Sequence, residues 1–306
     1  MKQLHEAIKE WMVKYKKNSV KLATYDRMLT SFDMMLNYTI AYVRLDVLCC
    51  DDIQEYINQL VKDEYALTTI KKQYNLITGF IKYANVLGLV ERPIYNNVKL
   101  PTQSVVLKQK KEIIAYDEVE QIKLRKVFDT HSSVEYDVAM FMMETGVRIG
   151  EALALQWGDI DWRKKAVRIN KTAIRLPNRR LQLVQNTAKS FSSNRIIPLS
   201  ARAIELLKCL LEKEQDTDGL IFHKSGGQML SYEGMRWHVR KACESAKVLY
   251  LGQHVFRHTF ATNCYNRGCD VKILSKLLGH SDVSVTYNTY IHLYGDTLDE
   301  MRKVIG

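Results

Sequence analysis

Residues 2–98 show one nearly uninterrupted helical pattern, and this stretch limits the folds open to the chain more than any other feature. Apolar side chains recur there at three- and four-residue intervals, and Pro93 is its only proline. Such spacing favours amphipathic helices that pack around a core of their own. We therefore predict a small, wholly helical N-terminal domain over residues 1–100, with helices at 4–16, 21–36, 53–61 and 70–87.

Residues able to cap a helix stand at three of the predicted helix starts. Asp51 or Asp52 fits the third helix, Thr68 or Thr69 fits the fourth, and Asp117 fits a helix further along the chain. Each side chain can accept a hydrogen bond from an N–H group that the first helical turn leaves free.

The rest of the chain divides into a basic linker, residues 101–114, and a C-terminal domain, residues 115–306. The linker lacks a helical stripe and contains Lys108, Lys110 and Lys111. In the C-terminal domain, short runs typical of strands interrupt the helical pattern. We predict a mainly α fold with a small antiparallel β-sheet in this domain. The expected strands are 165–170, 181–184 and 194–198, and the expected helices include 149–155, 201–214, 232–246, 254–268 and 271–278.

Composition narrows the possible partners. The chain has 306 residues, more than a single core usually holds, and its formal net charge is +11. This charge favours a polyanionic partner such as nucleic acid, with an acidic membrane surface as the alternative. No apolar run reaches the length of a membrane span, and no signal peptide is visible, so we expect a cytoplasmic protein. The six cysteines show no metal-binding spacing, so we expect neither a disulfide nor a structural metal.

Five separated residues indicate phosphodiester chemistry. Arg148 and Arg257 provide two planar guanidiniums suited to the non-bridging oxygens of a phosphate. Tyr290 is a candidate nucleophile, and because its phenol is mostly protonated at neutral pH, it needs cations or bases nearby. His254 and His280 can move protons near neutrality.

Lys189 is the candidate general acid for the leaving sugar oxygen. It stands in a predicted turn before the strand that starts at Arg195, on a hairpin whose tip could reach the minor groove of DNA. No carboxylate cluster accompanies these residues, which argues against chemistry based on two metal ions. No phosphate-binding glycine loop of the GxxxxGK[ST] type occurs either, so we expect no cofactor.

These motifs together resemble the tyrosine recombinase (phage integrase) family over roughly the whole chain. They appear in the order typical of that family: Thr145-Gly146-Val147-Arg148-Ile149-Gly150-Glu151, Lys189, His254-Val255-Phe256-Arg257-His258, Leu278-Gly279-His280 and Tyr290. The ten-residue step from His280 to Tyr290 favours integrases of phages and conjugative transposons over Xer-type enzymes.

The resemblance implies a role for each catalytic candidate. Arg148 and Arg257 would hold the scissile phosphate, Lys189 would protonate the leaving 5′ oxygen, and Tyr290 would form a 3′-phosphotyrosyl link. His254 would be the acid and base, and His280 would hydrogen-bond the phosphate. Tyr287 and Tyr294 are the competing tyrosines, and Tyr290 fits the family ending best.

Two further residues receive supporting roles from the resemblance. Glu151 would buttress Arg148, and His258 would pack or cap. The alternative for Glu151 is a charge on the helix surface.

The resemblance also implies an assembly. The N-terminal helices would form a core-binding (SAM-like) domain that closes with the catalytic domain into a C-shaped clamp around double-stranded DNA. Lys108, Lys110, Lys111 and Arg195 are the expected DNA contacts. The protein would be a monomer or weak dimer when free and a homotetramer on synapsed DNA, with a C-terminal tail that contacts a neighbouring subunit. An accessory DNA-bending or directionality protein is a further possible partner.

Four functions remain open from sequence. The first is a site-specific recombinase that integrates or excises a mobile element through a Holliday junction. The second is an Xer-type resolvase of chromosome or plasmid dimers. The third is a monomeric enzyme like a type IB topoisomerase, and the fourth is an architectural DNA-binding protein.

Overall fold

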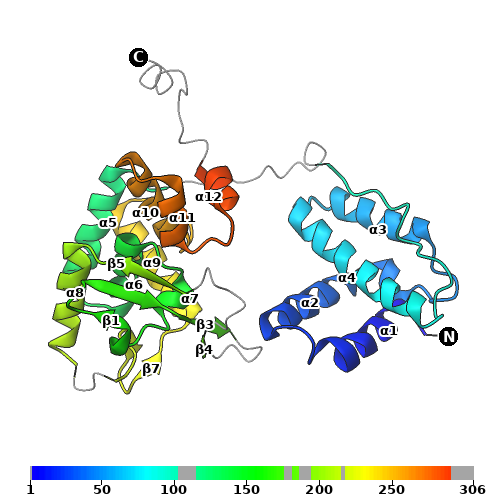
Figure 1. The fold of residues 1–306 in the computed structure, drawn as a ribbon. Helices are drawn as coiled ribbons and strands as arrows, with labels where there is room; N and C mark the ends of the chain where they lie inside the picture. The colour runs from blue at the N-terminus through cyan, green and yellow to red at the C-terminus, as the bar shows by residue number, and fades with distance from the viewer. Residues whose placement is uncertain (1, 103–114, 176–180, 186–193, 215–217, 291–306) are drawn as a thin grey trace, which may run out of the picture. The chain divides into compact units, whose positions relative to one another are not determined.

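A computed structural model describes residues 2–102, 115–175, 181–185, 194–214 and 218–290 of the chain. The fold is mainly helical, as predicted, and the chain divides into two compact units, Met1–Lys111 and Glu112–Gly306 (Figure 1). The predicted linker spans this division, and most of it, with Lys108, Lys110 and Lys111, lies outside the described residues. No helix in the described parts is both long enough and apolar enough to cross a membrane.

The N-terminal unit is built from helices that share one apolar core. Trp11 packs edge-on against Phe80 in this core, with ring centroids 5.9 Å apart. Buried aliphatic side chains such as Ile8, Ile57 and Ile77 fill the rest of it. The helices are α1 (Leu4–Trp11), which continues as a π-helical turn (Met12–Lys16), α2 (Leu22–Met35), a 3-10 turn (Thr39–Tyr42), α3 (Cys50–Lys62) and α4 (Leu67–Val86).

Two predicted helix starts in this unit are wrong by a few residues. Helix α3 is capped by Cys49, and Asp52 lies inside the first turn, where its carboxylate accepts from the Cys49 backbone N–H at 2.8 Å. An acidic side chain is also favourable there because it faces the positive end of the helix dipole. Helix α4 starts after Ala66, whose carbonyl accepts from the Thr69 N–H at 2.7 Å.

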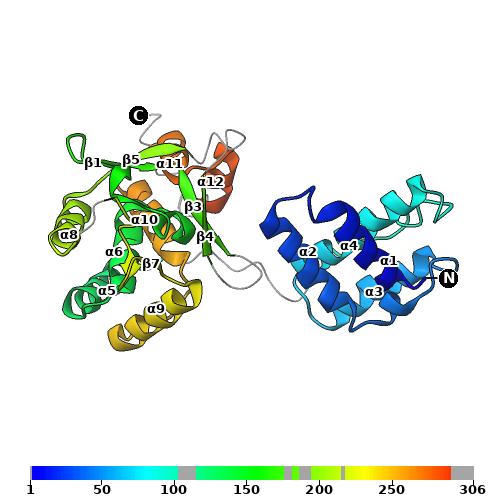
Figure 2. The ribbon, with the colours of Figure 1, turned by 90° about the horizontal axis from the view of Figure 1, so that it is seen from below.

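The C-terminal unit is arranged around α6, which is buried on nearly all sides. Figure 2 shows α6 among the other helices of this unit. The predicted cap at Asp117 is confirmed, because its carboxylate accepts from the Glu120 N–H at 2.7 Å. The helices are α5 (Glu118–Thr130), α6 (Val134–Thr145), α7 (Ile149–Ala152), α8 (Ala201–Leu211), α9 (Tyr232–Ala246), α10 (Val255–Asn266), α11 (Val271–Leu278) and α12 (Val283–Tyr290).

Short antiparallel sheets complete this unit, as the sequence predicts. Strands β1 (Ile160–Asp161), β2 (Ala166–Ile169) and β5 (Arg195–Pro198) form one sheet in that order, with Val167 opposite Ile197. Strand β3 (Lys171–Arg175) pairs antiparallel with β4 (Leu181–Gln185), and β6 (His223–Lys224) pairs with β7 (Gln228–Met229).

The hairpin predicted between residues 181–184 and 194–198 is wrong. Strand β4 pairs with β3, whereas β5 pairs with β2. Strand β5 alternates buried and exposed residues, so its inner face, with Ile197, belongs to the core beside β2.

Candidate functional site

Arg148 is positioned by the tight turn that ends α6. Gly146 adopts a left-handed conformation with φ of 65°, and a Cβ added there would lie 2.3 Å from the Phe260 ring. The chain therefore turns sharply and places Arg148 at the N-cap of α7. From there the Arg148 backbone N–H and one guanidinium nitrogen both donate to Glu151, each at 2.8 Å.

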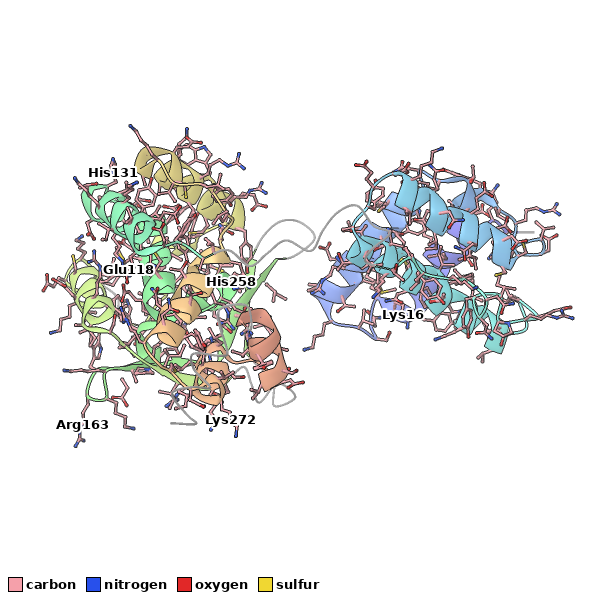
Figure 3. The ribbon with its side chains drawn as sticks, turned by 90° about the horizontal axis from the view of Figure 1, so that it is seen from above. Lys16, Glu118, His131, Arg163, His258 and Lys272 are labelled. Atoms are coloured by element: carbon pink, nitrogen blue, oxygen red, sulfur yellow. The ribbon has the colours of Figure 1, made fainter. Side chains whose placement is uncertain are left out.

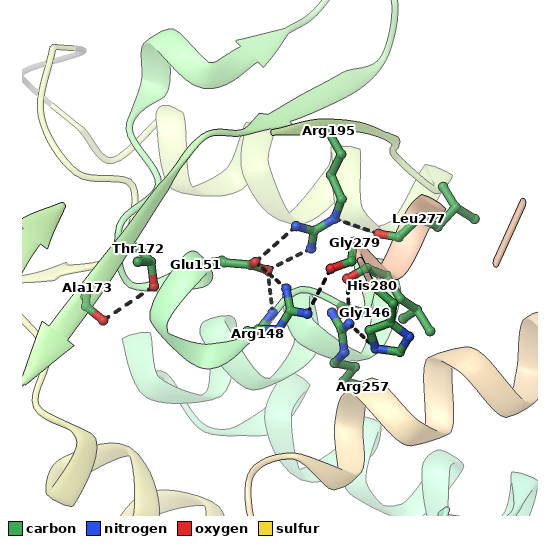
Figure 4. Close-up of polar contacts among 11 residues, drawn as sticks. Gly146, Arg148, Glu151, Thr172, Ala173, Arg195, Arg257, Leu277, Gly279 and His280 are labelled. Atoms are coloured by element: carbon green, nitrogen blue, oxygen red, sulfur yellow. Dashed lines mark hydrogen bonds and ion pairs between the residues drawn. The ribbon is translucent and has the colours of Figure 1, made fainter. Parts of the chain in front are cut away.

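Arg257 projects from α10 into the interior and is 2% exposed. Its Nη1 donates to the Gly146 carbonyl at 2.8 Å, and its Nη2 donates to Leu278 and to the His280 ring. The same glycine turn that places Arg148 thus also holds Arg257. Residues more than one hundred positions apart in the sequence meet at this point (Figure 4).

Three consecutive carbonyl groups at the C-terminal end of α11 each accept a hydrogen bond from a different arginine. The pairs are Arg195 Nε to Leu277 O at 2.7 Å, Arg257 Nη2 to Leu278 O at 2.5 Å, and Arg148 Nη2 to Gly279 O at 3.0 Å. The last carbonyls of a helix lack partners within the helix and face its negative dipole end, so they attract cations. We call Leu277, Leu278 and Gly279 the carbonyl triplet.

Glu151 and Arg195 form a buried, two-pronged ion pair beside the triplet. The Glu151 oxygens lie 3.0 and 2.7 Å from the two terminal nitrogens of Arg195, and the side chains are 4% and 6% exposed. Burial alone would raise the Glu151 pKa, but the hydrogen bonds and charge of Arg195, with Arg148 nearby, lower it to about 2. Glu151 is therefore ionised and contacts Arg148, the contact that its predicted supporting role requires.

The DNA contact predicted for Arg195 does not fit this arrangement. Its Nε and both terminal nitrogens donate to Leu277 and Glu151, and the residue is buried. The sequence does contain a signal for this, because Arg195 and Ile197 are two residues apart in a strand and so share its inward face.

His280 links Arg257 to α12. Its Nε2 lies 3.0 Å from Arg257 Nη2, which can only donate, so Nε2 is the acceptor. The ring hydrogen is then on Nδ1 and is donated to the Thr286 hydroxyl oxygen at 2.7 Å. Burial, together with the nearby Arg257, Arg148 and Arg195, lowers the His280 pKa to about 4, so the ring is neutral near pH 7.

The other two histidines lie at the start of α10. His254 is the N-cap residue and is exposed, whereas His258 is half-buried one turn later (Figure 3). Their rings meet edge to face with centroids 5.7 Å apart. Partial burial and the positive charge of Arg257 lower the His254 pKa, and burial lowers the His258 pKa to about 4.

The remaining predicted residues are only partly described. Tyr290 is the last residue of α12, and the structure describes its backbone position alone. Lys189 lies outside the described residues, as does Tyr294, and Tyr287 is 47% exposed. The structure thus brings Arg148, Arg257, His280 and Glu151 together. Sequence reasoning missed the partners of Arg195, the role of Thr286 as hydrogen-bond partner of His280, and helix α12 itself.

Comparison with known proteins finds relatives that match nearly the whole chain. The model of the phage integrase family matches residues 108–296, which is more than half of the chain. A XerC-like tyrosine recombinase of Caldanaerobacter subterraneus subsp. tengcongensis is 26% identical over 95% of this chain and 79% of its own length. The integrase of Staphylococcus phage L54a is 26% identical over 94% of this chain and 88% of its own length.

Solved structures match the fold. The Tn1549 transposon integrase, in complex with a circular intermediate DNA, superposes with a TM-score of 0.82 at 15% identity over 100% of this chain and 99% of its own. A lambda integrase tetramer bound to a Holliday junction gives 0.66 at 14% identity over 93% and 77%. The chain has the fold of the two-domain integrases. The chain belongs to the phage integrase family and is an enzyme of the tyrosine recombinase type, which confirms the family predicted from the motifs.

Proposed function

We propose that the protein is a site-specific DNA recombinase that cleaves and rejoins strands through a 3′-phosphotyrosyl intermediate and a Holliday junction. The observation that supports this best is that Arg148 and Arg257 meet on neighbouring carbonyls of the triplet, with the His280 ring against Arg257, next to the helix that carries Tyr290. Two guanidiniums at one point provide the charge and the paired donors that a phosphoryl group in displacement requires.

The proposed cleavage step exchanges one phosphoester for another. The Tyr290 oxygen attacks phosphorus and its phenolic proton leaves, while the bond from phosphorus to the 5′ oxygen breaks. Lys189 gives a proton to that 5′ oxygen. Arg148, Arg257 and His280 hold the non-bridging oxygens, and His254 is the acid and base for the tyrosine proton. In the rejoining step a 5′ hydroxyl attacks the phosphotyrosine, and Tyr290 recovers its proton.

We assign double-stranded DNA as the partner and integration or excision of a mobile element as the biological role, because the relatives include a phage integrase and a transposon transposase. The net charge of +11 suits a phosphate backbone. The related Tn1549 and lambda integrase structures contain DNA, and the lambda structure is a tetramer on a Holliday junction. The N-terminal helical unit would act as the core-binding domain, and four copies would act together on two duplexes.

The test is covalent trapping on nicked suicide DNA that carries the ends of the encoding element. The wild-type chain is expected to give an adduct at Tyr290 by peptide mass spectrometry, and Tyr290→Phe is expected to bind the DNA without an adduct. Tyr287→Phe is the matched control and keeps the adduct. An adduct on another tyrosine overturns the assignment of the nucleophile, and no adduct on tightly bound DNA overturns the proposed reaction.

Assembly is tested separately with two labelled duplexes. A recombinase is expected to give strands exchanged between the duplexes, with a four-way intermediate. Relaxation of supercoiled DNA without any exchange would instead favour the enzyme like a type IB topoisomerase.

A further inference from the structure

Thr286 is a buried polar residue that the proposed reaction does not use. It lies on α12, is 1% exposed, and its hydroxyl oxygen is 2.7 Å from Nδ1 of His280. The other ring nitrogen of His280 accepts from Arg257. A continuous series of hydrogen bonds therefore runs from the phosphate-binding arginine through the histidine to the helix that carries Tyr290.

The spacing along α12 gives this contact its importance. Thr286 and Tyr290 are four residues apart, so they lie one helical turn apart along the same side of the helix. Fixing Thr286 against His280 therefore fixes the part of the backbone from which Tyr290 extends. Helix α12 has few strong helix formers, because its sequence is VSVTYNTY, so its position depends on such tertiary contacts.

We propose that Thr286 is a positioning residue that sets the ring of His280 and the backbone of Tyr290 in one geometry. This inference rests on the proposed function. Thr286 does not touch the reacting atoms; it accepts the Nδ1 hydrogen of His280 and so directs Nε2 toward Arg257. If the hydroxyl is removed, Nδ1 loses its acceptor in a buried place, and both the ring and the helix are free to shift.

The contact also determines what His280 does when a phosphate arrives. In the DNA-free protein Nε2 is an acceptor, so it cannot donate to a phosphate oxygen. When phosphate oxygens take the Arg257 donors, the negative charge of the phosphate favours protonation of Nε2, which can then donate to a phosphate oxygen. Throughout this change Thr286 keeps its hydrogen bond with Nδ1, so the ring does not rotate. Small displacements of catalytic groups slow a reaction strongly, so a hydrogen bond that keeps the His280 ring in place supports the cleavage rate.

The experiment compares Thr286→Val, which has the same shape without the hydroxyl, with Thr286→Ser, which restores it. Single-turnover cleavage of suicide DNA is measured at saturating protein. We expect Thr286→Val to lower the rate roughly 10- to 100-fold, as for the loss of a buried hydrogen bond. We expect Thr286→Ser to come within about threefold of wild type, and the dissociation constant for DNA to stay unchanged in both. Ser284→Ala removes an exposed hydroxyl from the same helix and is the control.

A second measurement needs no DNA and separates this proposal from the proposed function. Nitrogen-15 NMR of the histidine rings reports which nitrogen of His280 is protonated. Wild type and Thr286→Ser are expected to show the Nδ1–H form, and Thr286→Val a different or mixed form. The signals of His254 and His258 report whether each variant is folded, and Thr286→Ala replaces the valine variant if it is not.

The outcomes are distinct. A valine variant with wild-type cleavage rate, or with an unchanged His280 ring, overturns the role of Thr286. If wild type itself forms no adduct, the proposed function fails, while the NMR comparison still decides whether Thr286 sets the His280 ring.

Discussion

The two units of the molecule differ in what they bury. Among the described residues, the buried polar side chains of the N-terminal unit are Ser31, Gln73 and Thr78, none of which carries a charge. The C-terminal unit buries charged side chains as well: Glu135, Glu151, Asp159, Arg195 and Arg257. Both units are helical and have apolar cores, so the difference concerns chemistry rather than architecture.

Buried charges are tolerated in the C-terminal unit because each has an ion-pair or hydrogen-bond partner. Glu151 holds Arg195, and both Asp159 oxygens accept from Lys171 at 2.5 to 2.6 Å. An isolated charge would be far too costly in such a place. In the N-terminal unit, the ion pair between Lys2 and Glu10 has side chains that are 57% and 61% exposed. The comparison shows that one unit uses charge at its surface, and the other uses charge as part of its internal structure.

The largest expected effect comes from removing one partner of the buried pair. Glu151→Ala leaves Arg195 charged and unpaired in the interior, so we expect the free energy of unfolding of the C-terminal unit to fall by about 3–5 kcal/mol. Glu10→Ala is the matched control in the other unit, with an expected change within about 0.5 kcal/mol. Urea titration of the full chain measures both. Similar changes for the two variants would remove the proposed difference between the units.

Arg257→Lys tests whether a buried charge acts in the reaction rather than only in the fold. A lysine keeps the charge but lacks the flat fork of donors that serves Gly146, Leu278 and His280. We expect the rate of covalent adduct formation to fall roughly 10²- to 10³-fold. The control is Arg202→Lys, which alters an ion pair on the surface of α8 and is expected to keep the wild-type rate. A wild-type rate for Arg257→Lys contradicts the assignment.

We expect the C-terminal unit to lose stability at a higher pH than the N-terminal unit. The folded-state pKa of Glu151 is lowered to about 2, so its stabilising contribution is present above its unfolded value and is lost as pH falls toward 2. The folded-state pKa values of His258 and His280 are lowered to about 4. Both rings therefore contribute to the free energy of unfolding above pH 6.5, and this contribution is lost as pH falls toward 4.

The loss attributable to Glu151 is about 3 kcal/mol at full protonation. Urea titrations at pH 7, 5 and 3, followed by pulsed hydrogen exchange at one fixed pH, assign the loss to a unit. The buried polar side chains described in the N-terminal unit do not ionise in acid, so a loss confined to that unit would contradict the comparison.

Two glycines with the same backbone conformation give the last test, and Gly88 is expected to give the smallest effect of all. Gly88 has φ of 69° with open space around it, whereas Gly146 has φ of 65° against the Phe260 ring. Gly88→Ala should cost about 1 kcal/mol for the backbone alone. Gly146→Ala adds a steric clash, so we expect about 1–3 kcal/mol more, with slower cleavage because Arg148 moves. Equal melting temperatures for the two variants would show that the turn is not tightly packed.

The sequence predicts this fold well where the signal is local. Helical periodicity locates most of the described helices of both units, and the Asp117 cap is found because this aspartate directly precedes an amphipathic pattern. Pairing of strands is not local, so β4 and β5 were expected to join each other although each pairs with an earlier strand.

Two parts of the site were missed for physical reasons. Helix α12 consists mostly of β-branched and polar residues with weak helix propensity, so periodicity and propensity do not indicate it. Its start is nevertheless capped by Asp282, which accepts from the Ser284 N–H at 2.8 Å. From the sequence, Arg195 is predicted to contact DNA. Its actual partners, Glu151 and Leu277, are distant in sequence.

The carbonyl triplet determines when the arginine side chains of the site become ordered. A free arginine side chain loses about 2 kcal/mol of rotamer entropy when it is fixed. Arg148, Arg195 and Arg257 are already fixed on the end of α11 in the DNA-free chain. That loss therefore belongs to the folding of the polypeptide and not to its encounter with DNA. A substrate meets arginines whose arrangement was determined when the chain folded, before any DNA was present.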